Sequence, residues 1–152
     1  MDLFGLFQWL FGLGSDHKNR VADRKNEVAR LSAEISAEVG RVQDIIVLEQ
    51  RRLLARCDQL FPHDKTMREA CLSALGQLRT SNDQLRDLVE GNRRKLDKAS
   101  TFGDWDLLLR SYHEWRGTAS RLVPWVDGVI RQLHEVLDNE EHRRALAASQ
   151  GR

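Results

Sequence analysis

Apolar residues recurring in steps of three and four are the feature that most constrains the fold of this chain. Beyond Ser15 the spacing is interrupted at two places, Phe61-Pro62-His63-Asp64 and Ser100-Thr101-Phe102-Gly103. Pro62 disfavours helical backbone at the residue before it, and both segments are rich in turn residues. Since steps of three and four place side chains on one face of a helix, we expect three long amphipathic helices. Their expected bounds are 15–60, 64–99 and 104–146.

The third of these segments has the most regular repeat. Its two apolar rows have a seven-residue spacing. One row is Trp105, Tyr112, Ala119, Val126 and Leu133, and the other is Leu108, Trp115, Leu122, Val129 and Val136. The phase continues past Pro124, which removes one backbone hydrogen bond and clashes with the preceding turn. The repeat therefore predicts one helix kinked near Pro124, and we expect the tail over 148–152 to fray.

The composition agrees with a helical fold, because the 152 residues include only two Pro and ten Gly. Short turns between long helices make consecutive helices antiparallel. We therefore predict an all-α protein: an elongated, coiled-coil-like, up-down-up three-helix bundle over 15–147, preceded by a short apolar N-terminal helix.

Asn82 and Asn92 occupy core-type positions in the second expected helix. A buried Asn at such a position fixes register and partner number at some cost in stability. The alternative is that this seam is slightly exposed to solvent. The sequence leaves both readings open.

The first fourteen residues, MDLFGLFQWLFGLG, form an apolar arm with a single charge at Asp2. On a helical wheel most of the large side chains share one broad face. We expect the following residues to insert into a membrane or a partner: Leu3, Phe4, Leu6, Phe7, Trp9, Leu10, Phe11 and Leu13. Gly5 and Gly12 lie on the opposite side, two turns apart, where they could let another helix approach closely.

The arm does not fit the usual targeting segments. A secretory signal needs a basic start and a small-residue cleavage site, and the leading charge here is acidic. As a helix, its roughly twelve apolar-region residues reach about 18 Å, against a hydrocarbon core of about 30 Å. Crossing the bilayer would require a thinner membrane or a cluster of arms.

The charged groups give no sign of catalysis or of a cofactor. The 24 basic and 23 acidic residues nearly cancel, which disfavours nucleic acid as a partner. No phosphate-binding loop, nucleophile motif or Cys-x-x-Cys pair occurs in the sequence. Four residues of the third helix resemble a metal-ligand set, but we interpret them as surface ion pairs: His134, Asp138, Glu141 and His142. We therefore expect a non-enzymatic protein with no catalytic residues, cofactor or metal.

Cys57 and Cys71 flank the first turn at similar distances, and both border the apolar stripes. They could lie within disulfide reach, but we favour buried reduced thiols, because Cys behaves as a small hydrophobe. Two Cys are also too few for a disulfide scaffold and suit a reducing compartment. Trp125 falls off the apolar rows of the third helix. It is a candidate partner contact, with packing against the flank of the first helix as the alternative reading.

These patterns favour a cytoplasmic protein that is peripheral to, or anchored at, the inner face of a membrane. Its arm would contact lipid, copies of itself, or both, and an extreme form would be a multi-copy pore or membrane-disrupting assembly. The alternative is a soluble adaptor or complex subunit whose N-terminal helix docks into a protein partner.

Overall fold

The computed structural model describes the backbone of residues 3–63 and 65–150, and the side chains of residues 19–63 and 65–150. All regular secondary structure in these residues is α-helix, which confirms the all-α prediction. The helices are α1 (Leu3–Leu60), α2 (Lys65–Gly91), α3 (Arg93–Lys98) and α4 (Phe102–Gln150).

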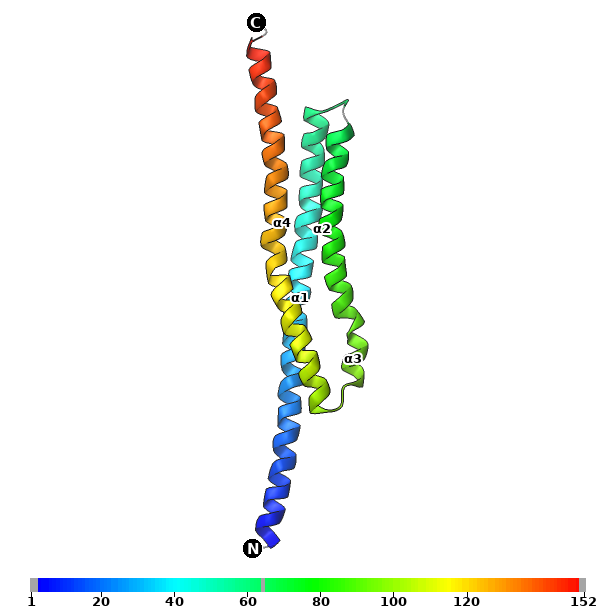
Figure 1. The fold of residues 1–152 in the computed structure, drawn as a ribbon, viewed down its shortest axis with the longest axis vertical. Helices are drawn as coiled ribbons and strands as arrows, with labels where there is room; N and C mark the ends of the chain where they lie inside the picture. Colours follow the sequence, from blue (N-terminus) through cyan, green and yellow to red (C-terminus); the bar gives the residue numbers. More distant parts are fainter. Residues whose placement is uncertain (1–2, 64, 151–152) are drawn as a thin grey trace.

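The long helices lie side by side (Figure 1), with α2 and α3 running opposite to α1 and α4. Their apolar stripes meet in one core that contains buried residues of α1, α2 and α4. Burying apolar side chains is the main favourable term in folding, so this shared core accounts for the lateral association of the helices. On α1 the buried residues include Val28, Ile35, Val42 and Ile46, which lie on the expected stripe.

α1 continues without a break through the point where a separate N-terminal helix was expected to end. Its bounds, Leu3–Leu60, include the arm and Ser15, where we had expected a new helix to start. No Pro occurs before Pro62, and Gly is tolerated inside a helix at a cost of about 1 kcal/mol. The backbone of the arm is therefore an extension of the long helix.

The second expected helix, 64–99, is divided at Asn92 into α2 and α3. The Asn92 side-chain nitrogen donates to the Leu88 carbonyl at 2.8 Å, in competition with the backbone N–H that normally binds it. Gly91, which precedes it, adds backbone freedom. Asn92 is half-buried, whereas Asn82 is buried. Asn82 therefore fits the reading of a buried core Asn, and Asn92 fits the reading of a seam that is partly exposed to solvent.

α4 begins with a capping box. The Thr101 hydroxyl accepts a hydrogen bond from the Asp104 backbone N–H at 3.2 Å, and the Asp104 carboxylate accepts one from the Thr101 N–H at 2.9 Å. Hydrogen bonds from Thr101 and Ser100 lower the pKa of Asp104. The helix therefore starts before Asp104, where the sequence had placed its first residue.

α4 contains Pro124 without an interruption of the helix, and it changes direction where yellow gives way to orange in Figure 1. At its other end the helix continues to Gln150, beyond the expected end at residue 146, and the expected fraying over 148–152 stays a prediction. The Ala-rich sequence Ala145 to Ala148 explains the longer helix, because Ala has the highest helix propensity.

Candidate functional site

The N-terminal part of α1 extends past the α3–α4 turn (Figure 1). Val21 is the first described α1 residue that packs on the core. At the same level, the Arg24 guanidinium lies 5.5 Å from the centre of the Phe102 ring and 3.6 Å from the Asp106 carboxylate. These contacts attach the start of α4 to α1. The α1 backbone before Val21 therefore projects by about 27 Å, at about 1.5 Å per residue.

The predicted inserting residues Leu3 to Leu13, with Gly5 and Gly12, all lie in this projecting segment. Their side chains fall outside the described residues, so their contacts stay predictions. The backbone places them at the end of the molecule opposite to the α1–α2 turn (Figure 1).

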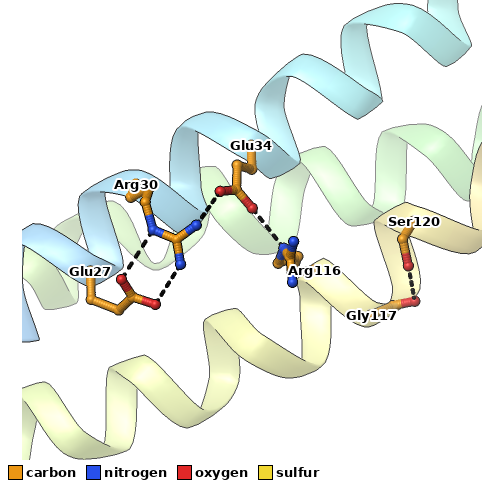
Figure 2. Close-up of polar contacts among 6 residues, drawn as sticks. All are labelled: Glu27, Arg30, Glu34, Arg116, Gly117 and Ser120. Carbon is orange, nitrogen blue, oxygen red and sulfur yellow. Dashed lines mark hydrogen bonds and ion pairs between the residues drawn. The ribbon is translucent and has the colours of Figure 1, made fainter.

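A chain of ion pairs joins α1 to α4 (Figure 2). Arg30 donates to Glu27 at 2.6 and 3.0 Å and also to Glu34. Glu34 in turn accepts a hydrogen bond from Arg116 of α4 at 2.6 Å. The hydrogen bond from Arg30 lowers the pKa of Glu27. Glu34 is the residue through which this surface chain links the two helices.

A second polar cluster joins the same helices near the other end. His134 and the Glu49 carboxylate lie 2.9 Å apart, and His134 also lies 3.2 Å from the Arg56 guanidinium. Arg56 donates to Asp138 at 2.6 Å and to Glu141 at 3.0 Å. Within the described residues, no group of three His, Cys, Asp or Glu side chains could hold a metal ion. The hydrogen bonds and ion pairs of the cluster connect α1 with α4, and Arg56 is a partner that the sequence reasoning did not identify.

Glu49 of this cluster, and Glu140 farther along α4, have lowered pKa values. Burial acts to raise the pKa of Glu49, but hydrogen bonds from His134 and Arg52 outweigh it, and the net shift is downward. Hydrogen bonds from Arg143 and Arg144 lower the pKa of Glu140 to about 2. Each carboxylate is thus stabilised in its charged form in the folded chain.

Acid should therefore destabilise the fold. A carboxyl group with a pKa below its ordinary value of 4.5 contributes stability above that value and loses it as the pH falls through the folded pKa. We expect the urea midpoint, followed by circular dichroism, to change little from about pH 7 to about pH 5 and then to fall towards about pH 2. Glu49→Gln should lower the midpoint at neutral pH and flatten the acid decline. A midpoint that rises below pH 4.5 would contradict this assignment.

Trp125 is 46% exposed on α4. Leu107 and Val136, which precede and follow it by whole numbers of helical turns, are also exposed, Leu107 to 66%. Leu107 lines a groove of about 360 Å³ between α3 and α4. The structure thus leaves Trp125 partly accessible to a partner, and its role as a partner contact stays a prediction.

Asn82 lies between α2 and α1 and is 1% exposed. Its side-chain nitrogen donates to the Val39 carbonyl at 3.1 Å, whereas its side-chain oxygen has no hydrogen-bond partner in the described structure. It lines a groove of about 290 Å³ together with Gln43, whose side-chain oxygen is also buried without a described partner. This polar seam fits the role of Asn in fixing the alignment of two helices.

No protein-family model, curated protein or solved structure matches the chain. In the part of the chain that the structure describes, no helix combines the length and the apolar character that crossing a membrane requires.

Proposed function

We propose that the chain is a non-enzymatic, membrane-associated protein that assembles with copies of itself. Its body is an up-down-up three-helix bundle, and its apolar N-terminal helical segment is the anchor. The observation that supports this most directly is the continuity of α1 from Leu3 to Leu60, which carries the apolar arm beyond the other helices. We further propose a cytoplasmic location at the inner face of a membrane.

The length of the projecting segment suits insertion into one leaflet. Leu3 to Leu13 extend about 16 Å as a helix, close to half of a hydrocarbon core of about 30 Å. Four basic residues follow directly, at the level where anionic headgroups would lie: Lys18, Arg20, Arg24 and Lys25. Such residues are attracted to anionic lipid, although acidic neighbours in the same segment weaken the attraction.

Self-association would lower the cost of placing the first turn of α1 in hydrocarbon. The first backbone N–H groups of a helix have no intrahelical acceptor, and leaving each one unpaired in hydrocarbon costs several kcal/mol. A lone arm inserted end-on would bear this cost. A cluster of arms that admits water at its tip reduces it, and Gly5 and Gly12 offer a surface for close packing between arms.

The test is vesicle co-sedimentation of the full chain carrying Phe7→Asp and Phe11→Asp. Each lost Phe contact should weaken binding to vesicles containing anionic lipid by about tenfold or more. The matched control carries Leu88→Asp and Leu107→Asp, which add the same charge at two exposed apolar positions of the body.

Loss of binding in the arm variant, with binding retained in the control, supports the proposal. Equal binding by the two variants would reject the arm as the anchor. If the natural chain fails to bind vesicles yet forms oligomers that the arm substitutions dissociate, the soluble alternative replaces membrane association. A chain shortened to begin at Ser15 provides a further comparison in the same assay.

A further inference from the structure

Cys57 and Cys71 form a pair of buried thiols beside the α1–α2 turn. Cys57 lies in the last turns of α1, and Cys71 lies in the second turn of α2. Both are free, and their sulfur atoms are 3.7 Å apart. A disulfide bond requires a sulfur separation of about 2.05 Å, so the two atoms need to approach by about 1.7 Å.

Polar contacts on both sides of the pair hold α1 against α2. Towards the turn, Arg68 lies 3.2 Å from the Asp58 carboxylate. Farther from the turn, Arg79 donates to the Gln50 side-chain oxygen at 2.8 Å. The folded chain therefore keeps the two thiols as neighbours, which raises the effective concentration of each thiol towards the other.

Burial controls how fast these thiols react. Burial is the largest cause that raises the pKa of Cys57, to about 11, and the neighbouring Cys71 adds to it. Since the thiolate is the nucleophile, Cys57 of the folded chain reacts slowly at neutral pH. Because burial affects the rate, the equilibrium between the dithiol and the disulfide is the better measure of whether the fold places the two sulfur atoms for bonding.

We propose that Cys57 and Cys71 are a redox-active pair that forms an intramolecular disulfide across the α1–α2 turn. The oxidant is a low-molecular-weight disulfide such as oxidised glutathione. One protein thiolate attacks it and releases one glutathione thiolate, and the second protein thiolate then displaces the other. The two protein thiols lose two electrons and two protons, one sulfur–sulfur bond forms, and one oxidised glutathione becomes two reduced molecules. The product joins the two helices covalently beside their connecting turn.

The experiment measures the thiol–disulfide equilibrium of the full chain in glutathione buffers of graded ratio. The fraction of intramolecular disulfide is read by mass spectrometry after acid quenching and thiol alkylation. Equilibrium is approached both from the folded protein and from protein refolded out of urea, which removes the effect of slow access. The same titration in concentrated urea gives the value for the unfolded chain. Cys57→Ser and Cys71→Ser each retain one thiol and are the controls.

We expect the equilibrium constant for oxidation to be at least about tenfold larger in the folded than in the unfolded chain, because a bond that fits the fold is stabilised by folding. The single variants should form only mixed disulfides with glutathione. A constant equal to or smaller than that of the unfolded chain would show that the helices resist closure, and this would overturn the proposal. Mixed disulfides or intermolecular dimers as the main product of the natural chain would also overturn it.

Discussion

Trp105→Ala should destabilise the chain by about 3 to 5 kcal/mol in the free energy of unfolding. Trp105 is 6% exposed and belongs to the core cluster at the end where the α1 extension emerges. Removing a buried Trp forfeits its transfer free energy and leaves a cavity, because the surrounding helices relax only in part. Urea unfolding of the full chain, followed by circular dichroism, measures this loss.

Trp125→Ala is the matched comparison, because it makes the same substitution on the same helix. Since Trp125 is 46% exposed, its truncation should cost about 1 kcal/mol or less. A loss as large as that of Trp105→Ala would show that Trp125 is a packing residue, and it would remove the main reason for considering it a partner contact. A small loss at both positions would instead contradict the placement of Trp105 in the core.

The helical fold could be predicted because periodicity is a local signal. Val28, Ile35 and Val42 recur at a fixed spacing, and that spacing alone identifies the buried face of α1. Asn82 and Asn92 show where this reasoning stops. Both fit the same stripe, yet one is buried against Val39 and the other binds the carbonyl one turn before it. The spacing of apolar residues does not show that another helix packs over Asn82, nor that the Asn92 side chain competes for a backbone carbonyl.

The polar contacts of the candidate site were less accessible to prediction for the same reason. His134, Asp138 and Glu141 could be recognised as a polar group on one helix face, and the sequence reasoning favoured ion pairing for them. Their common partner, Arg56, lies far away in the chain. Its identity depends on the axial alignment of α1 and α4, which apolar spacing does not fix to within one helical turn.

Pro124→Ala should stabilise the chain by about 2 kcal/mol and raise its urea midpoint. Pro lacks a backbone N–H, so the Ser120 carbonyl, four residues earlier, loses its helical donor, and an interior Pro costs a helix about 3 kcal/mol. Part of this gain in stability is lost, because Pro restricts the conformations of the unfolded chain and Ala does not. This difference in the entropy of the unfolded chain is worth up to about 1 kcal/mol.

The outcome also reports whether the change of direction in α4 is needed for packing. Arg116 before Pro124 contacts Glu34 at 2.6 Å, and His134 after it contacts Glu49 at 2.9 Å. If α1 accommodates a straighter α4, both contacts persist and the full stabilisation is observed. If Pro124→Ala destabilises the chain, the bend itself is required for both halves of α4 to reach α1. Gly128→Ala is the control for helix propensity, because a methyl group there meets no atom within 4 Å, and it should stabilise by about 1 kcal/mol without altering the bend.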